Sequence, residues 1–384
     1  MDFTWSDEQK ELQETVRSFA AGRLNEGLSE RLSAAAFSRE LWQECADFGI
    51  LGLPIPEVHG GSDRGVVNTI LAMEALGRGC RDQGLLFSMH AHMWSVVMPI
   101  LAFGTDAQKE RYLSALCDGG LVGAHGMSEP DSGSDAFSMR TRAEAVEGGY
   151  RLNGTKTFVT NAPVADLFVV FATVDRKRGM WGVTTFLIDK GTPGLSVSEP
   201  FKKMGLRTSP MAEIVLEDCF VPDDAVLGKP GQGAVIFNHS MAWERSCILA
   251  SQVGAMEHQL DLCLRYAKER KQFGKPIGDF QLVAARLADM KVRLDTSRLL
   301  LYRAAWAMAE DHDAEMASAV AKLYISEAAV ASALDAVRTH GGYGYMEEFE
   351  VERDLRDFLG GTMYSGTSDI QRLLVARHMG LRPV

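Results

Sequence analysis

A glutamate and an arginine stand side by side in an otherwise uncharged stretch, "AVIFNHSMAWERSCILASQVGAM" (234–256). Removing a carboxylate from water is costly unless the carboxylate is paired or used in chemistry. Glu244 is therefore a candidate general base, with Arg245 as the neighbour that adjusts its pKa. The alternative is a buried Glu–Arg pair that only fixes the helix register. Adjacent helical residues point in different directions, which favours the catalytic interpretation.

A second group of polar residues lies in "GMSEPDSGSDAF" (126–137), which is dense in Gly, Ser and Asp. Backbone N–H groups and hydroxyls in such a segment suit an anion or the polar edge of a ring. An ordinary turn has the same composition, so the residues alone leave both interpretations open. His90 and His92 occupy positions i and i+2 of one apolar run. Because such side chains point apart on a helix, we interpret them as core or pocket residues and expect no metal site.

The elements that must position these groups fall into three zones. Residues 1–120 and 229–384 carry long runs with helical periodicity. Between them, residues 121–228 hold short segments rich in β-branched and aromatic residues, separated by turn residues. This order predicts an α+β fold with an N-terminal helical domain, a compact antiparallel β-domain and a C-terminal helical domain, rather than a βαβ array.

Two local signals mark particular element ends. Ser6 followed by Gln9 forms a capping box that predicts the start of the first helix. Asn153-Gly154 predicts a hairpin turn inside the β-domain. No P-loop is present and no GxGxxG follows a strand, which argues against a nicotinamide-binding Rossmann unit.

Composition bounds the class of protein. The chain has 384 residues, of which 46% are hydrophobic and 24% charged, enough for a sizeable core. A net charge of −11 argues against nucleic-acid binding. The six cysteines form no CxxC pair, and the N-terminus is acidic and polar, unlike a signal peptide. We also expect no apolar run near the ~18 residues of a membrane span, and hence a cytoplasmic protein with reduced thiols.

Ordered segments along almost the whole chain resemble the signatures of the acyl-CoA dehydrogenase superfamily. They are "GMSEPDSGSD" (126–135), "NGTKTFVTNAPVADLFVVFA" (153–172), "KMGLRTSPMAEIVLEDCFVP" (203–222), "YAKERKQFGKPIGDFQ" (266–281), "HGGYGYMEEFEVERDLRD" (340–357) and "YSGTSDIQRLLVARHMG" (364–380). The resemblance implies the three domains described above, the last a four-helix bundle. It also implies FAD as cofactor and a homotetramer or homodimer.

The resemblance assigns FAD contacts residue by residue. Met127 and Ser128 match residues that hold the pyrimidine edge, and Ser134 matches one that meets the pyrophosphate. Phe158 and Thr160 match residues at the flavin ring, with Phe158 in place of the usual tryptophan. The other implied contacts involve the neighbouring subunit's FAD, the adenine dinucleotide and the C-terminal signature: Arg270, Phe273, Gln281, Arg338, Gly341, Gly342, Thr367 and Asp369.

The position of the base departs from the common family pattern. Most relatives place their catalytic glutamate immediately before the Gly-Thr of the C-terminal signature, where this chain has Ser365, and a serine hydroxyl is too weak a base. One branch, including isovaleryl-type enzymes, instead carries the glutamate on the first long helix after the β-domain, and Glu244 matches it. The resemblance then implies that Glu244 takes the α-proton of a thioester and that flavin N5 takes the β-hydride. A flavin hydroxyl and the backbone N–H of Ser365 would hold the thioester carbonyl.

Closer similarity, in "TNAPVAD" (160–166) and "HSMAWERSC" (239–247) among others, points to dehydrogenases of antibiotic pathways that oxidise an L-prolyl thioester tethered to a carrier protein. The alternatives are a short- or branched-chain acyl-CoA dehydrogenase of the isovaleryl type, a flavin monooxygenase or oxidase, and a catalytically silent scaffold. The expected electron acceptor is an electron-transfer flavoprotein or oxygen.

Bulky residues near the base predict a short acyl pocket: His92, Trp94, Met241 and Trp243. Carrier proteins are usually acidic, so an enzyme with a net charge of −11 needs a local basic surface to receive one. "DRKRG" (175–179) and "FKK" (201–203) are the candidates, and ordinary solvated loops are the alternative.

Overall fold

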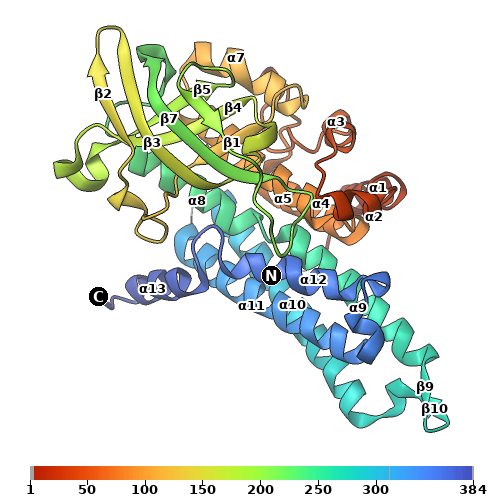
Figure 1. Ribbon diagram of the computed structural model, residues 1–384. Helices are drawn as coiled ribbons and strands as arrows, with labels where there is room; N and C mark the ends of the chain where they lie inside the picture. The colour runs from red at the N-terminus through yellow and green to blue at the C-terminus, as the bar shows by residue number, and fades with distance from the viewer. Residues whose placement is uncertain (1–3, 311, 383–384) are drawn as a thin grey trace.

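The computed structural model describes residues 4–310 and 312–382. Figure 1 shows a β-domain beside the N-terminal helices, with the C-terminal helices packed below both. The N-terminal helices are α1 (Asp7–Arg23), α2 (Leu28–Ala34), α3 (Arg39–Asp47), α4 (Gly65–Gly79), α5 (Gln83–His92), α6 (Met98–Phe103) and α7 (Asp106–Cys117). The predicted capping box starts α1: the Gln9 N–H donates to Ser6 Oγ at 3.2 Å, and the Ser6 N–H donates to Gln9 Oε1 at 3.1 Å.

The α5 helix continues through a π-helical turn, η2 (Met93–Val97), into α6. The expectation that no apolar run reaches membrane-spanning length is wrong, because Gln83–Phe103 has 21 residues and Ala314–Tyr345 has 32. Their most apolar windows are 83% and 61% buried inside the protein. Burial of this extent is typical of core helices. The π-helical turn is of interest because such turns are frequent at functional sites.

The middle of the chain forms an eight-stranded sheet in the order β6-β7-β3-β2-β4-β5-β8, with β1 paired to β4. The strands are β1 (Gly123–Gly126), β2 (Arg142–Val146), β3 (Gly149–Thr160), β4 (Leu167–Thr173), β5 (Val183–Asp189), β6 (Leu195–Val197), β7 (Met211–Pro222) and β8 (Val226–Leu227). Most pairs are antiparallel as predicted, but β1–β4 and β2–β4 are parallel, so the sheet is mixed. No tight turn joins either parallel pair, so nothing forces an antiparallel arrangement there.

The hairpin turn predicted at Asn153-Gly154 is wrong. Both residues lie inside β3, whose pairing with β7 shifts register between Leu152 and Gly154. A Cβ on Gly154 would come within 2.7 Å of the Thr141 Cα. Glycine is therefore required by the close approach of two backbones. The β2–β3 connection lies earlier, where Gly148 has a φ of +77°.

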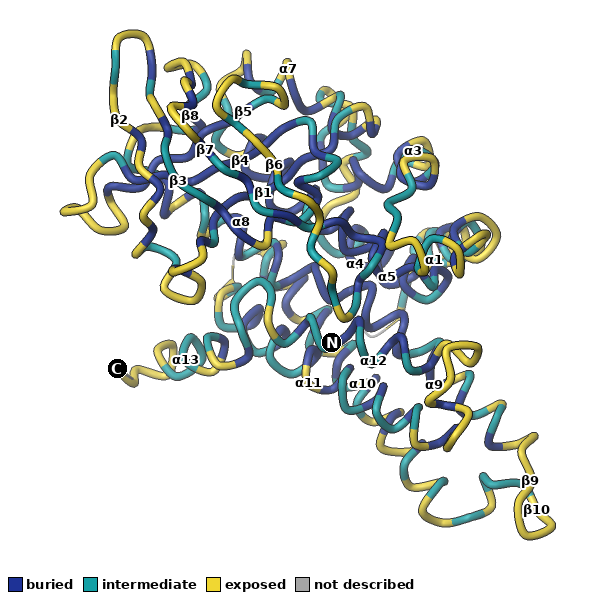
Figure 2. The backbone as a smooth tube through the Cα atoms, in the orientation of Figure 1, coloured by how far each residue is buried: buried dark blue, intermediate teal, exposed yellow. Residues whose placement is uncertain are grey.

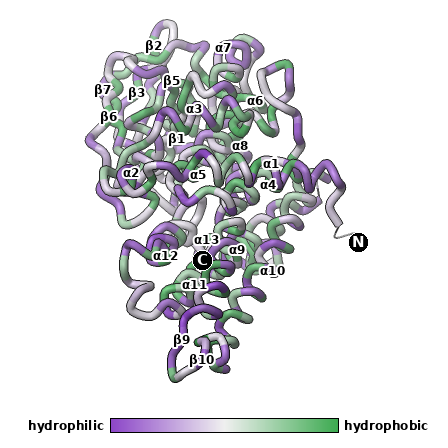
Figure 3. Tube along the Cα trace, turned by 90° about the vertical axis from the view of Figure 1, so that its right-hand side faces the viewer, coloured by the Kyte–Doolittle hydropathy of each residue, from purple (hydrophilic) through white to green (hydrophobic). Residues whose placement is uncertain are grey.

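The C-terminal part is helical, as predicted. Its elements are α8 (Gly233–Cys247), α9 (Ala250–Glu269), β9 (Lys271–Gln272), β10 (Lys275–Pro276), α10 (Gln281–Ala309), α11 (Ala314–His340), α12 (Val351–Leu359) and α13 (Ser368–His378). The helices α9, α10 and α11 pack on one another, and α8, α12 and α13 pack on α11. The β9–β10 hairpin projects from one end of these helices and is mostly hydrophilic (Figure 3).

Two apolar cores hold the protein together. The larger core joins the N-terminal and C-terminal helices, with α4 packed on α9, and the smaller core lies inside the β-domain. Buried backbone is concentrated in α4 and α5 below the sheet (Figure 2), and η2, which continues α5, packs on α8. This junction positions the glutamate of α8 against η2.

Candidate active site

Glu244 lies on α8 with its carboxylate inside the protein and is 8% exposed. Ser95 donates a hydrogen bond to one carboxylate oxygen, and Ser365 donates one to the other. Ser95 belongs to η2 and Ser365 to the connection between α12 and α13, so three segments distant in sequence meet at this carboxylate. A carboxylate held from both sides keeps one orientation, which a base aimed at a particular carbon requires.

Burial raises the pKa of Glu244 to about 7. The hydrogen bond from Ser365 and the charges of Arg245 and Lys322 lower this pKa, but by less than burial raises it. A carboxyl group with a pKa near the working pH is deprotonated in a useful fraction of molecules and is basic enough to take a proton. The electrostatics of the site therefore suit Glu244 to general-base catalysis.

Arg245 contacts the same residue as Glu244, but through a different atom. Its Nε donates to the Ser365 carbonyl oxygen at 3.5 Å. Within residues 4–310 and 312–382, no ion pair joins Arg245 to Glu244. The idea of a Glu–Arg pair that only fixes the helix register therefore has no support in the geometry.

Ser365 and Gly366 form a turn with left-handed backbone, at φ values of +54° and +87°. A non-glycine residue in this region is strained and must be held by its surroundings. Gln371 Nε2 donates to the two carbonyl oxygens of the turn at 3.3 and 3.0 Å, and Lys322 Nζ donates to that of Gly366 at 2.6 Å. The Ser365 N–H has no acceptor in the described part of the chain, so it is available to a ligand.

Two tryptophan rings pack on each other where η2 meets α8. Trp94, next to Ser95 on η2, is stacked on Trp243 of α8 with ring centroids 5.8 Å apart and 11° between the ring planes. Trp94 Nε1 donates to His90 Nδ1 at 2.8 Å, and His90 Nε2 lies 2.9 Å from Ser251 Oγ. This chain of contacts fixes the buried tryptophan in one position.

The predicted pocket residue His92 does not join this group. Its Nδ1 accepts the Gly123 N–H at 2.9 Å, and its Nε2 lies 3.1 Å from the Leu116 carbonyl oxygen. Both ring nitrogens thus connect α7 to β1, and burial lowers the pKa of His92 to about 4. Met241 is buried one turn before Glu244 on α8, and its place in an acyl pocket stays a prediction.

The segment that carries Met127 and Ser128 is fastened to β3 by a buried ion pair. Lys156 Nζ donates to Glu129 Oε1 at 2.7 Å and to the Met127 carbonyl oxygen at 3.1 Å. The Thr157 N–H donates to the Ser128 carbonyl oxygen at 2.9 Å. A buried ion pair is tolerated when further hydrogen bonds satisfy it, as these do. The two residues predicted at the flavin pyrimidine edge are thereby fixed.

Phe158 stands out from β3 and is 66% exposed. Its φ of +55° and the register shift between Lys156 and Val159 mark a bulge that turns the ring outward. Thr160 is half-buried at the end of the same strand, and Ser134 is exposed. An aromatic ring presented on a bulged strand offers a face on which a planar ligand can stack.

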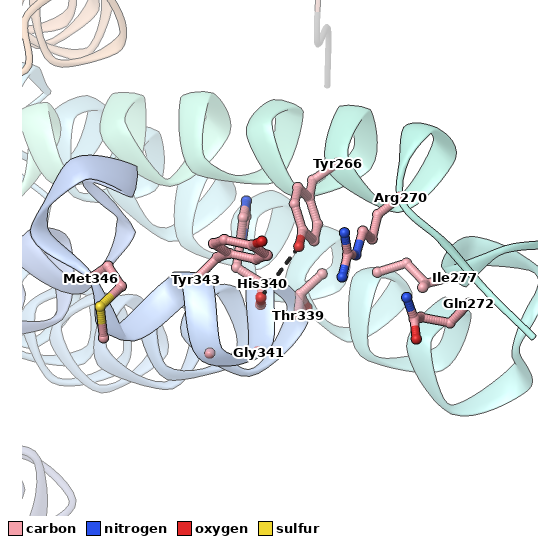
Figure 4. Close-up of a pocket in the computed structure, with 10 residues that line it drawn as sticks. Tyr266, Arg270, Gln272, Ile277, Thr339, His340, Gly341, Tyr343 and Met346 are labelled. Atoms are coloured by element: carbon pink, nitrogen blue, oxygen red, sulfur yellow. Dashed lines mark hydrogen bonds between the residues drawn. The ribbon is translucent and has the colours of Figure 1, made fainter.

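A cavity of about 450 Å³ lies at the C-terminal ends of α9 and α11 (Figure 4). Its lining combines aromatic rings, a guanidinium and glycine backbone: Tyr266, Arg270, Gln272, Ile277, Thr339, His340, Gly341, Gly342, Tyr343 and Met346. The Arg270 guanidinium lies 5.4 Å from the centroid of the Tyr343 ring. A Cβ on Gly341 or Gly342 would meet nothing within 4 Å. The structure thus brings three predicted FAD residues together here.

Three other predicted FAD residues, on the β9–β10 hairpin, α10 and α11, lie outside this cavity's lining. Phe273, between β9 and β10, is 93% exposed, and Gln281 is exposed at the start of α10. Arg338 is exposed, with its guanidinium 3.7 Å from the Asp335 carboxylate. In Figure 1 the β9–β10 hairpin lies at the opposite end of the molecule from the β-domain. The predicted residues therefore form two separate groups in one protomer.

Two further predicted residues lie next to the Ser365 turn. Thr367 caps α13 by accepting the Ile370 N–H at 3.2 Å. Asp369 is exposed, and its carboxylate lies 3.4 Å from the Arg372 guanidinium.

Sequence reasoning missed Ser95, Lys322 and Gln371. Ser95 is one serine in an apolar run, and Lys322 lies on a helix remote in sequence, so no motif marks either residue. Gln371 could have been found, because it follows Ser365 by six residues and begins the second turn of α13.

This three-zone fold and its buried base define the acyl-CoA dehydrogenase family, and the chain belongs to it. Residues 6–120 match the family's N-terminal domain, residues 124–219 its middle domain and residues 231–380 its C-terminal domain.

Individual relatives match the chain from end to end. It is 44% identical to the L-prolyl-[peptidyl-carrier protein] dehydrogenase of Serratia sp. (strain ATCC 39006), over 100% of this chain and 99% of that protein. It is 36% identical to the mitochondrial isovaleryl-CoA dehydrogenase of Oryza sativa subsp. japonica, over 98% of this chain and 92% of that protein. Among solved structures, the prolyl acyl carrier protein oxidase AnaB is 46% identical with a TM-score of 0.97, over 98% of this chain and 100% of that chain. The structure "PigA with FAD and proline" is 44% identical with a TM-score of 0.98, over 100% of both chains.

Proposed function

We propose that the protein is an FAD-dependent dehydrogenase that introduces an α,β double bond into an aminoacyl thioester, an L-prolyl group on a carrier protein. The observation that carries this proposal is the buried Glu244 carboxylate, held by two serine hydroxyls and with a pKa raised to about 7. The named relatives with full-length similarity that act on prolyl carrier proteins support the choice of acyl group.

The chain's own groups account for activation of the thioester. Glu244 takes the proton from the α-carbon, while the Ser365 N–H donates a hydrogen bond to the thioester carbonyl oxygen and stabilises the charge that develops there. Lys322 and Gln371 hold the turn so that this N–H is already in place. FAD, when bound, supplies the acceptor for the hydride that leaves the β-carbon.

The described residues fit FAD. The exposed Phe158 ring offers a stacking face, and Arg270 offers a planar fork for a diphosphate. The open backbone at Gly341 and Gly342 leaves room for the cofactor to approach closely. Because Phe158 and Arg270 belong to separate groups, we propose that a second copy of the chain completes each FAD site in a homodimer or homotetramer.

We propose two candidate acceptors for the electrons of the reduced flavin, each suggested by a relative. An electron-transfer flavoprotein is supported by the structure "Electron transferring flavoprotein of Acidaminococcus fermentans: Towards a mechanism of flavin-based electron bifurcation", which is 36% identical with a TM-score of 0.96. Oxygen is supported by the similarity to AnaB, which is named an oxidase. We also infer a cytoplasmic protein, since its six buried free thiols suit a reducing compartment.

The test compares substrates on purified, flavin-loaded protein. We expect turnover of an L-prolyl carrier protein, detected as loss of flavin absorbance without oxygen and as a mass loss of one hydrogen molecule per round of oxidation. Isovaleryl-CoA is the competing substrate, because isovaleryl-CoA dehydrogenases are also relatives at 36–37% identity. Turnover of isovaleryl-CoA alone would refute the carrier-bound substrate. A hydroxylated product would instead indicate a monooxygenase.

A further inference from the structure

We propose that a basic, aromatic segment of the β-domain is the docking surface for the carrier protein; this inference rests on the proposed function. The segment is η5 (Arg176–Gly182), between β4 and β5. Its exposed side chains, which we name the η5 patch, are three cations and two apolar residues: Arg176, Lys177, Arg178, Met180 and Trp181. The occupant is an acidic carrier domain whose phosphopantetheine arm holds the thioester.

The η5 patch keeps a net positive charge. Within residues 4–310 and 312–382, no acidic side chain forms an ion pair with its three cations, and the one nearby hydrogen-bonded carboxylate, Asp175, caps the segment by accepting the Lys177 N–H at 2.9 Å. Lys190 of the same domain, by contrast, lies 3.6 Å from the Asp166 carboxylate. In a chain with a net charge of −11, such a patch is a local attraction for an acidic partner.

The apolar part of the η5 patch suits a protein partner. Trp181 is 57% exposed and Met180 36%. Tryptophan beside arginine is the combination that dominates the binding energy of protein interfaces. A free CoA ester offers phosphates to the cations and an adenine ring to Trp181, so the patch by itself suits either form of the thioester. We choose the carrier domain because the relatives named for a prolyl carrier protein match the chain over its full length.

The other basic candidate, residues 201–203, is weaker. Lys203 is turned inward, where its Nζ donates to the Leu206 carbonyl oxygen at 2.8 Å and also to the Ser209 carbonyl oxygen. Only Lys202 of this segment keeps an exposed charge. The structure thus separates two stretches that are equivalent in sequence.

The η5 patch lies along the helix that carries the base. The segment packs on α8 and on η3 (Ala136–Ser138), and a Cβ on Gly231, just before α8, would lie 2.9 Å from the Trp181 carbonyl oxygen. On η3, Phe137 makes an edge contact with Phe237 of α8 at 5.7 Å. Phe237 precedes Glu244 by seven residues, about 10 Å of helix at 1.5 Å per residue. A carrier seated on η5 is therefore within reach of the base through a flexible arm.

The test compares two substrates and two double variants. The substrates are an L-prolyl carrier protein and the L-prolyl thioester of free pantetheine. The variants are R176E/R178E in the patch and R64E/R151E, which makes the same change in charge at exposed cations elsewhere. We expect R176E/R178E to raise the KM for the carrier substrate about tenfold or more, since steering by charge changes association rates by this order. The pantetheine thioester and the control variant should change less than about twofold.

Binding measurements complete the design. Carrier affinity of the wild-type protein should fall as salt is added, and this dependence should weaken in R176E/R178E. W181A should weaken carrier binding while leaving turnover of the pantetheine thioester intact. An unchanged KM for the carrier in R176E/R178E, or an equal loss with both substrates, would overturn the docking site. A wild-type protein inactive on both L-prolyl thioesters would instead overturn the proposed function, and the docking inference with it.

Discussion

At the scale of single residues, activity should depend on one carboxyl group. Glu244→Gln keeps the shape of the side chain, and its amide oxygen can still accept one of the two serine hydrogen bonds while its NH2 group donates to the other hydroxyl. The amide cannot take a proton from substrate. We expect turnover to fall by about 10³-fold, within the range found when a general base is removed. Flavin content and the thermal midpoint should stay close to those of the wild type. Stopped-flow reduction of the flavin measures the effect, and unchanged turnover would mean that another group is the base.

The pH dependence should follow the same carboxyl group. Only the deprotonated Glu244 can act as a base, so kcat/KM should rise as the pH increases through about 7, the raised pKa of this group, and then level off. Ser365→Ala removes a hydrogen bond that lowers this pKa but keeps the backbone N–H. We therefore expect the rise of kcat/KM to move to higher pH in Ser365→Ala. A rise at the same pH in both proteins would show that the hydroxyl does not tune the base.

At the scale of elements, two glycines set the contact between α4 and α9. A Cβ on Gly77 would lie 2.0 Å from the Ser251 carbonyl oxygen, and one on Gly254 would lie 1.9 Å from that of Glu74. Backbone atoms cannot rotate away, so the helices would have to separate. We expect Gly77→Ala to lower the free energy of unfolding by about 2–3 kcal/mol, at the upper end of the usual cost of overpacking.

Gly22→Ala on α1 is the matched control, because a Cβ there would meet nothing within 4 Å. Alanine is favoured over glycine in a helix by up to about 1 kcal/mol, so this variant should be neutral or slightly stabilised. Thermal midpoints of the flavin-loaded proteins measure both effects. Gly77→Ala should also reduce turnover, since α9 carries the Ser251 that contacts His90 beneath Trp94. Equal midpoints for the two variants would contradict tight packing at this crossing.

The helices could be predicted from the sequence more reliably than the contacts between segments that are distant in the chain. Helical periodicity and the Ser6–Gln9 capping box were sufficient for the helices, because both signals are local. The hairpin turn predicted at Asn153-Gly154 was wrong. In a sequence, a glycine required by the close approach of two backbones looks the same as a glycine required by a turn. Ser95 could not be found, since its role depends on η2 meeting α8, which no short window of sequence encodes. His92 was assigned to the pocket from its neighbours, whereas its ring bonds lie between α7 and β1.

At the scale of the whole molecule, the two groups of predicted FAD residues argue for assembly. Phe273 is 93% exposed, and its ring has one aromatic neighbour in the described chain, Phe280 at 6.0 Å. An aromatic side chain this exposed adds little to the stability of its own protomer. If it covers the flavin dinucleotide of a second copy, its loss should weaken FAD binding without unfolding the protein. We expect Phe273→Ser to raise the Kd for FAD about tenfold. A tenfold change corresponds to about 1.4 kcal/mol, near the free energy of one good aromatic contact.

The control for Phe273→Ser is a substitution of an exposed apolar residue that is not predicted to contact FAD. Val58 is an exposed apolar side chain of the N-terminal part, 83% exposed, so Val58→Ser makes a comparable change away from the hairpin. Fluorescence titration of FAD into stripped protein measures the Kd, and light scattering after size exclusion gives the assembly at the same concentrations. Weaker FAD binding in Phe273→Ser but not in Val58→Ser would show that the hairpin contributes to the cofactor site. Since Phe273 lies at the opposite end of its own protomer from the β-domain, that contribution requires a second copy. Equal FAD affinity in both variants, or a monomer that binds FAD as tightly as the assembled protein, would contradict a site shared between subunits.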